Sequence, residues 1–314
     1  MQIFKSTPTF DFMSKRKYAV IFSLLLVLGA IGSLINNGLN FGLDFTGGTL
    51  IEVGYADPVE LGPIRKTLEQ AGFGDAIVQH FGTSKDVLVR LAPREESADK
   101  ESIGDQILKA LRKDSSSEVK MRRQEFVGPQ IGDELRDDGG LAMLIAMAFI
   151  LIYVMARFEY RFAIGSIIAL IHDVIITLGL FALFQWEFDL TVLAAVLAVI
   201  GYSLNDTIVV FDRIRENFRK QRKETPIGVI NTSLNQTISR TMMTSLTTLM
   251  VVLAMFFYGG ELIHSFSTAL IVGIVVGTYS SIYVASTAAL ALNITRESLM
   301  PVQKEGADQA NQET

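Results

Sequence analysis

Two carboxylates, Asp173 and Asp206, lie inside long apolar stretches of this chain, whereas all its other acidic residues lie in polar segments. Placing a charge at such depth in a bilayer costs at least about 2.5 kcal/mol on insertion scales, so intramembrane carboxylates face protein or water and are functional candidates. The chemistry they could support is uptake and release of a proton or a cation. A carboxyl group that only fixes helix packing is the alternative.

Asp206 lies within the sequence GYSLNDTIVVFDRIREN, residues 201–217. The residues before it are spaced four, three and four apart, which places small side chains on one helix face suited to close packing. This face consists of Ala194, Ala198, Gly201 and Asn205. Asp206 borders this face and is therefore predicted to point into a helix bundle. It lies six residues, roughly 9 Å along the helix, from Asp212 at the cytoplasmic end of the span.

A second stretch supplies a basic counterpart, Arg240, at the end of a hydroxyl stripe with the same spacing. The stripe is formed by Thr237, Thr241, Thr244 and Thr248. Consecutive spans are antiparallel, so Arg240 and Asp206 can approach in depth, and a guanidinium beside a buried carboxyl group would tune its proton affinity. Arg240 as an inner-face anchor and the threonines as ordinary packing residues are the alternatives.

Three further motifs carry polar or small residues at informative places. His172 and Asp173 are adjacent near the middle of one span, so we expect them to point to different faces and serve different neighbours. Gly273 and Gly277 form a GxxxG pattern, which predicts a helix-packing face. The sequence LDFTGG contains Asp44 and the adjacent Gly47 and Gly48, which suggests special backbone angles at the start of a domain.

Several chemistries are excluded or disfavoured. The chain has no cysteine and only three widely separated histidines, which excludes thiolate chemistry and argues against a zinc site. Its net charge of −5 argues against nucleic-acid binding. The motifs GxxxxGK[ST], GxSxG and HExxH are absent from the sequence, so neither an ATP motor nor a common hydrolase is supported. We expect no cofactor and no metal, and an ion gradient as the energy source.

Composition predicts the elements that position these residues. Of the 314 residues, 49% are hydrophobic and only 19% are charged, below the roughly 25% charged of soluble domains. Six segments are long and apolar enough to span a membrane: 18–36, 141–156, 162–184, 191–211, 241–258 and 265–292. A polar domain, 37–140, separates the first two, and the only other long connection is 212–240. The tails are 1–17 and 293–314.

The distribution of Lys and Arg predicts the orientation. Basic residues gather in the N-terminal tail, after the second span, in 212–240 and in the C-terminal tail, while the connections 185–190 and 259–264 contain none. Under the positive-inside rule both termini are cytoplasmic and 37–140 lies outside. Within that domain the pattern of apolar residues and turns predicts the order β-α-β-β-α-β. The first strand follows the Gly-Gly turn within 43–56, the other strands lie in 76–81, 86–91 and 118–127, and the helices lie in 59–71 and 98–112. This is the ferredoxin-like split βαβ pattern.

Five segments together identify a family. They are FGLDFTGGTLIEV (41–53), EFVGP (125–129), HDVIITLG (172–179), GYSLNDTIVVFDRIREN (201–217) and SSIYVAS (280–286). In this order and around six spans they resemble the SecF branch of the SecD/SecF protein-export family, which is related to the RND transporters. The resemblance runs from Tyr18 to about Glu297.

The resemblance implies a polytopic α-helical bacterial inner-membrane protein: six transmembrane helices, half of an RND-type bundle, with a small ferredoxin-like α+β periplasmic domain between the first two. It implies SecD as the obligate partner half, together with YajC, the SecYEG channel, the exported preprotein and membrane lipid. It implies a non-enzymatic subunit that uses the proton motive force late in export. Asp206 would carry the proton beside Arg240. The other candidate coupling residues are Asn205, Asp173, His172 and Thr244, and the other motif residues are Asp44, Gly47, Gly48, Gly201, Asp212, Arg213, Gly273 and Gly277.

Three alternatives stay open at this point. The chain could be a passive assembly subunit whose polar residues only pack. It could be an intramembrane aspartyl protease that uses Asp173 and Asp206, although the GxGD signature is absent and the two carboxylates would have to share one site. The coupling ion could be Na⁺, since a carboxylate and hydroxyl groups suit either ion.

Overall fold

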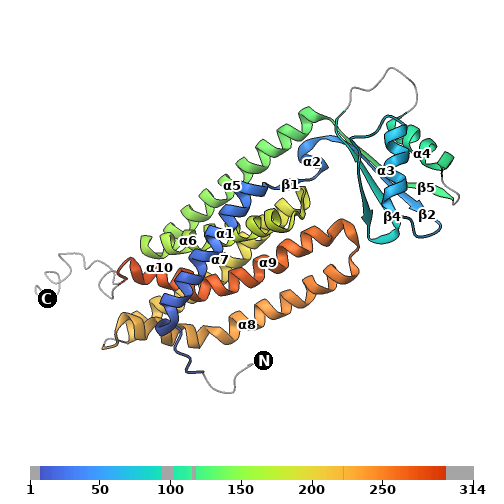
Figure 1. The fold of residues 1–314 in the computed structure, drawn as a ribbon. Helices are drawn as coiled ribbons and strands as arrows, with labels where there is room; N and C mark the ends of the chain where they lie inside the picture. The colour runs from blue at the N-terminus through green and yellow to red at the C-terminus, as the bar shows by residue number, and fades with distance from the viewer. Residues whose placement is uncertain (1–7, 94–101, 115–117, 222, 295–314) are drawn as a thin grey trace, which may run out of the picture.

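The computed structural model describes residues 8–93, 102–114, 118–221 and 223–294. Across these residues six helical segments are long and apolar enough to cross a membrane, and they form an elongated bundle with an α/β domain beyond one end (Figure 1). The helices are α1 (Arg16–Asn37), α5 (Pro129–Arg157), α6 (Tyr160–Phe184), α7 (Leu190–Lys220), α8 (Pro226–Tyr258) and a last segment built from α9 (His264–Ser280), a π-helical turn (Ser281–Ala285) and α10 (Ser286–Ala291). The expected fold class is confirmed.

Three helices, α5, α7 and α8, extend well beyond the apolar runs that predicted them. Helix α5 begins at Pro129 rather than near residue 141, because proline at the first helical position needs no hydrogen-bond partner and has the right φ angle. The predicted connection 212–240 is also mostly helical, with only 221–225 between α7 and α8. Asn217 holds these polar helix ends together, since its side-chain amide donates to Ser233 and to Gln236 at 2.8 Å each.

The helices differ in how much of their surface is covered. α6, α7 and the last segment are about half buried along their most apolar stretches, whereas α1, α5 and α8 are mostly exposed. The exposed apolar side chains on these three helices, such as Leu25, Phe149 and Met250, are suited to lipid or to a partner helix.

The α/β domain contains a four-stranded antiparallel sheet, with its two helices on one face. Its strands are β2 (Gly48–Tyr55), β3 (Ile77–Phe81), β4 (Thr83–Leu91) and β5 (Val119–Val127), and its helices are α3 (Leu61–Gln70) and α4 (Ile103–Asp114). The strand order β3-β4-β2-β5 is that of a split βαβ fold and agrees with the predicted pattern. Part of the predicted helix 98–112 lies outside the described residues. Alternate residues of the central strands, including Ile51 and Val89, form the core beneath the two helices.

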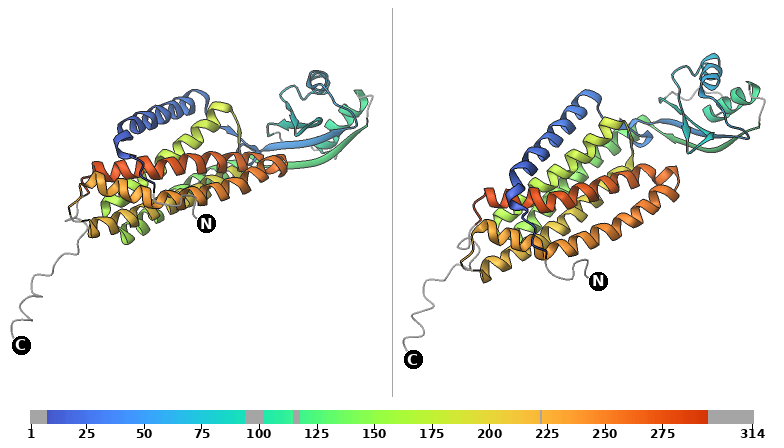
Figure 2. Two further views of the ribbon diagram at one scale, coloured as in Figure 1. Left: turned by 90° about the horizontal axis from the view of Figure 1, so that it is seen from below. Right: turned by 60° about the horizontal axis from the view of Figure 1, so that its bottom comes forward.

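The first strand of this domain begins at the Gly-Gly turn, at Gly48, as predicted. The turn is preceded by a short helix that the sequence did not predict, α2 (Leu43–Thr46). Just before α2, a two-residue strand, β1 (Asn40–Phe41), pairs in parallel with β6 (Glu187–Phe188) from the connection between α6 and α7. The domain therefore contacts the bundle through a segment far away in sequence, and both views in Figure 2 show it at one end of the helices.

Candidate functional site

Asp206 is buried on α7, with 3% of its surface exposed. Its Oδ2 has no hydrogen-bond partner among the described residues. The groups that act on the carboxyl electrostatically come from α8: the hydroxyls of Ser245 and Thr244 and the guanidinium of Arg240. A buried carboxyl with an unused oxygen, next to hydroxyls and a cation, can exchange a proton without first breaking an internal ion pair.

Arg240 itself is exposed. It is close enough for its charge to influence Asp206, as the antiparallel arrangement predicted, but no ion pair joins the two side chains in the described part of the chain. Thr244 is half-buried, and its hydroxyl donates to backbone oxygens of its own helix. The hydroxyl stripe therefore lies partly against the bundle, with Thr237 and Thr241 buried.

Sequence reasoning missed Ser245, whose hydroxyl acts on the Asp206 carboxyl together with that of Thr244. Ser245 is buried, and its Oγ lies 2.7 Å from the hydroxyl oxygen of Thr278 on α9. Its signal was available, since Ser245 follows Thr241 by four residues and so lies on the same helix face. The site thus joins α7, α8 and α9.

His172 and Asp173 form a second buried polar site. Their other neighbours differ, as expected, since Asp173 bonds α7 and α9 while His172 lines a groove at α1. The sequence did not predict that the two side chains also contact each other. Nδ1 of His172 lies 2.9 Å from Oδ1 of Asp173, because the imidazole is long enough to reach the adjacent carboxylate. The other carboxylate oxygen accepts from Ser203 of α7 at 2.5 Å and from Ser280 of α9 at 2.8 Å. Asp173 therefore links α6, α7 and α9 at a point where the last helix changes to a π-helical turn.

These contacts argue against a two-carboxylate protease. The hydrogen-bond partners of the Asp173 carboxylate among the described residues are His172, Ser203 and Ser280, and Asp206 is not one of them. The two carboxylates therefore do not share a proton, as an aspartyl dyad requires. Ser203 precedes Asp206 by three residues on α7, so the two sites lie about one helical turn apart on that helix.

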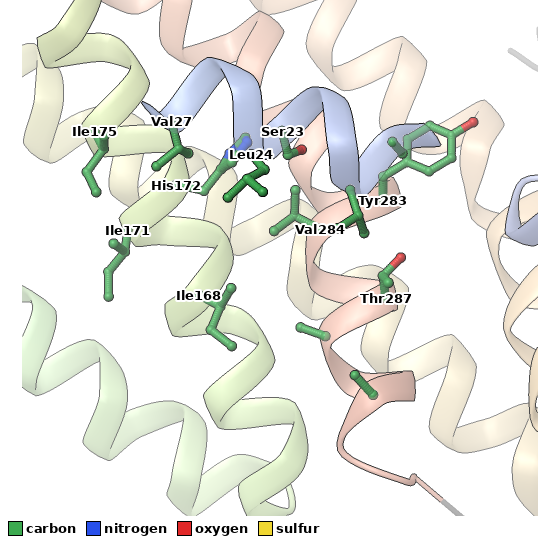
Figure 3. A pocket seen from close by; sticks show the side chains of 14 residues that line it. Ser23, Leu24, Val27, Ile168, Ile171, His172, Ile175, Tyr283, Val284 and Thr287 are labelled. Carbon is green, nitrogen blue, oxygen red and sulfur yellow. The ribbon is translucent and has the colours of Figure 1, made fainter. Parts of the chain in front are cut away.

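The other ring nitrogen of His172, Nε2, is buried without a partner among the described residues. It lies at a groove of about 430 Å³ between α1, α6 and α10, whose lining is mostly apolar (Figure 3). At the edge of this groove the hydroxyl of Tyr279 donates to the backbone oxygen of Ala19 at 2.8 Å and lies 3.0 Å from the Ser23 hydroxyl. These contacts fasten α1 to the last helix.

The predicted glycine face of the last span is confirmed. A Cβ on Gly273 would lie 2.1 Å from a methyl carbon of Val199, and one on Gly277 would lie 3.0 Å from Cβ of Ser203. Both glycines therefore let α9 approach α7 closely.

The small-residue face of α7 is exposed rather than packed against another helix of the described chain. Ala194, Ala198, Gly201 and Asn205 are all exposed, and a Cβ on Gly201 would meet nothing within 4 Å. The sequence predicted close helix packing here, but in the described part of this chain no helix covers the face. Asp206 nevertheless points inward as expected, because it lies about 100° around the helix from Asn205.

The remaining predicted motif residues lie at the two ends of the bundle. Asp44 contacts the start of α7, where its Oδ2 accepts from the backbone N–H of Leu190 at 3.0 Å. At the opposite end Asp212 lies 3.9 Å from Arg157, and Arg213 pairs with Glu216 at 2.8 Å. The structure does not bring these residues to Asp206. No group of three or more His, Asp or Glu side chains that could hold a metal occurs among the described residues.

Comparison with known proteins identifies the family. Residues 107–295 match the family described as protein export membrane protein SecD/SecF, C-terminal, and residues 32–59 match the SecD/SecF GG motif. The chain is 55% identical to protein translocase subunit SecF of Vibrio alginolyticus over 98% of each chain. It is 51% identical to protein translocase subunit SecF of Pseudomonas aeruginosa over 94% of this chain and 95% of the relative.

A solved structure agrees with the sequence relationship. The fold resembles the crystal structure of SecDF, a translocon-associated membrane protein, from Thermus thermophilus, with a TM-score of 0.82 and 39% identity. The match covers 91% of this chain but only 39% of the SecDF chain, so this chain spans about two-fifths of that protein. The chain therefore belongs to the SecD/SecF family and is a SecF-type, multi-pass membrane subunit of the bacterial protein-export machinery.

Proposed function

We propose that this subunit uses the proton motive force to promote a late step in protein export, with Asp206 as the group that takes up and releases the proton. The observation that carries the proposal is the buried, incompletely bonded carboxyl of Asp206 beside Ser245, Thr244 and Arg240. Moving one charge across 100 mV releases about 2.3 kcal/mol. A few protons in each cycle are therefore enough to shift a conformational equilibrium of the α/β domain.

We further propose that SecD supplies a second half of the membrane unit. The SecDF chain is longer than this chain and contains a matching region. The uncovered face formed by Ala194, Ala198, Gly201 and Asn205 supports this proposal, because small residues allow close contact with a helix from another chain. YajC, the SecYEG channel and the exported preprotein are proposed partners on the strength of the family resemblance.

In the proposed orientation both termini are cytoplasmic and residues 37–140 lie in the periplasm. An even number of spans is consistent with placing both ends on one side, and the distribution of Lys and Arg selects the cytoplasmic side. Asp206 then lies on the helix that connects the cytoplasmic end of the bundle with the base of the α/β domain.

Export of a preprotein into proteoliposomes, with the ATP-driven step saturated, tests the function. We expect an imposed proton gradient to stimulate the wild-type complex and not the Asp206→Asn complex. Asp138→Asn is the matched control, because it removes the same charge from an exposed position on α5. If a sodium gradient stimulates export and a proton gradient does not, the coupling ion is Na⁺ rather than H⁺. Full gradient dependence in Asp206→Asn would refute the assignment, and the chain would then act as a passive subunit.

A further inference from the structure

The start of α7 is held by carboxylates from two distant parts of the chain. The first backbone N–H groups of a helix lack intrahelical partners, and negative charge is favoured at that end. Asp189, the residue before the helix, accepts from the N–H of Val192 at 2.8 Å. Asp44, which precedes Leu190 by 146 residues, accepts from its N–H at 3.0 Å. Both residues cap the helix, but only Asp44 belongs to the segment that leads into the α/β domain.

Backbone pairing holds this segment against the connection between α6 and α7. Asn40 and Phe41 pair in parallel with Glu187 and Phe188, and the N–H of Gly42 donates to the carbonyl of Phe188 at 2.8 Å. A Cβ on Gly42 would lie 3.0 Å from Cβ of Asp189. The two backbones are therefore in close contact immediately before α7 begins.

The sheet itself is tied to the same place by Arg90 of β4. Its guanidinium donates to the carbonyl of Phe41 at 2.7 Å and to the hydroxyl of Thr46 at 2.6 Å, and it lies 3.6 Å from the Glu187 carboxylate. Burial raises the pKa of Glu187 and the Arg90 charge opposes that shift. We call residues 40–44 and 187–190 together with Arg90 the α7 clasp.

The segment that joins the clasp to the sheet is short and sterically constrained. Only three residues, 45–47, separate Asp44 from Gly48, the first residue of β2. Gly47 and Gly48 have φ angles of 65° and 119°, and a Cβ on Gly48 would lie 2.2 Å from the Leu91 carbonyl oxygen. A displacement of Asp44 cannot be absorbed by a flexible linker, because no such linker is present between it and the sheet.

We propose that the α7 clasp is the mechanical connection through which α7 moves the α/β domain, and that Asp44 is its positioning residue. The inference rests on the proposed function, because it assumes that the proton-carrying helix moves. Asp206 lies roughly 24 Å along α7 from Leu190, and the helix is continuous over that distance. A shift or rotation of α7 at Asp206 therefore reaches Asp44 through one rigid element.

Distance measurements between spin labels test the connection in the complex with a cysteine-free partner. The chain contains no cysteine, so labels at Glu60→Cys in the domain and Tyr258→Cys at the end of α8 are unique. Asp206→Asn mimics the protonated carboxyl. We expect it to shift the distance distribution when the clasp is intact, and we expect Asp44→Ala to abolish that shift.

Two further variants separate a connection from a simple helix cap. Asp189→Ala removes the other cap of the same helix start, and we expect it to preserve the shift. Asp44→Asn keeps an acceptor oxygen, and we expect it to restore part of the shift. If Asp44→Ala does not insert, Arg90→Met removes the sheet contact instead and is expected to reduce the shift.

The outcomes distinguish this inference from the proposed function. An undiminished shift in Asp44→Ala would overturn the clasp and leave the role of Asp206 intact. The absence of any shift with an intact clasp would also overturn it, and the export assay on Asp206→Asn would then decide the function separately. Loss of the shift in Asp189→Ala as well as in Asp44→Ala would reduce Asp44 to one of two ordinary caps.

Discussion

At the scale of single residues, the two carboxylates buried in the helix bundle have different roles because their hydrogen bonding differs. Asp173 has bonding partners on both oxygens and links three helices, whereas Asp206 keeps one buried oxygen free of partners among the described residues. A carboxylate with hydrogen-bond partners on both oxygens is held in one position and one charge state. A carboxyl group with an oxygen that lacks a partner can change its protonation state more easily. The proposed proton carrier is therefore Asp206.

Coupling between Asp206 and Arg240 can be measured by a double-mutant cycle. Asp206→Asn removes a bias of about 2.3 kcal/mol per proton at 100 mV, roughly 50-fold, and should reduce gradient-stimulated export to background. Arg240→Met should also impair it, by removing the nearby positive charge. The double variant should be no worse than the worse single variant, because residues acting as a unit are non-additive. Independent, additive losses would contradict the coupling.

Glu187 gives a pH dependence of stability outside the membrane. Its pKa is raised from the ordinary 4.5 by burial, so the folded state holds the proton more tightly than the unfolded state. This group therefore destabilises the fold above its raised pKa, and the penalty is relieved as the pH falls toward the ordinary value. Thermal unfolding in detergent from about pH 8 to about pH 4.5 should show Glu187→Gln more stable than wild type at the upper end, with the two converging at the lower end. Parallel curves would refute this sign.

At the scale of elements, the GG turn between α2 and β2 is a steric constraint. Valine at Gly48 would adopt a strained positive φ and place its Cβ against the Leu91 carbonyl, and valine at Gly47 would meet Pro129 at 2.9 Å. Each should cost about 1–3 kcal/mol or more in unfolding free energy and impair export. Gly62→Val in α3 is the control, because a Cβ there meets nothing within 4 Å. Wild-type stability and export in both GG variants would reduce the motif to an ordinary turn.

At the scale of the whole molecule, the uncovered face of α7 predicts an interface with the partner half. Gly201→Leu adds a large side chain where this chain has open space, so the chain itself should fold and insert normally. Association with SecD, measured by co-purification and titration, should weaken by at least about tenfold, which corresponds to 1.4 kcal/mol. Gly29→Leu on α1 is the control, because it also adds bulk at an open, exposed position. Unchanged association would place the interface elsewhere.

The orientation of the whole chain can be tested by labelling single cysteines with an impermeant reagent. Glu60→Cys in the α/β domain should react from the outside of spheroplasts, and Lys223→Cys between α7 and α8 should react only after the membrane is opened. Both positions are exposed, so accessibility in the fold does not limit the reaction. The reverse pattern would invert the proposed topology, although not the fold.

The sequence by itself determined the number of spans, the order of strands and helices along the domain, and which carboxylates lie in the helix bundle. These features depend on local quantities: apolar run length, the periodicity of apolar residues, and the high cost of a charge in an apolar stretch. The GG motif and the GxxxG face were also predictable. Adjacent glycines indicate special backbone angles or a close backbone approach, and glycines four residues apart in an apolar helix indicate close helix packing.

Only the tertiary structure decided which groups meet across helices and where the domain contacts the bundle. The bonds from Ser203 and Ser280 to Asp173 depend on the rotation of three helices about their axes, and the contact of Asp44 with α7 joins residues 146 positions apart. The tertiary structure also showed that the small-residue face of α7 is exposed and is not packed against another helix of the described chain. Spacing along the sequence fixes which residues share a helix face, but the packing of all the helices together fixes what that face contacts.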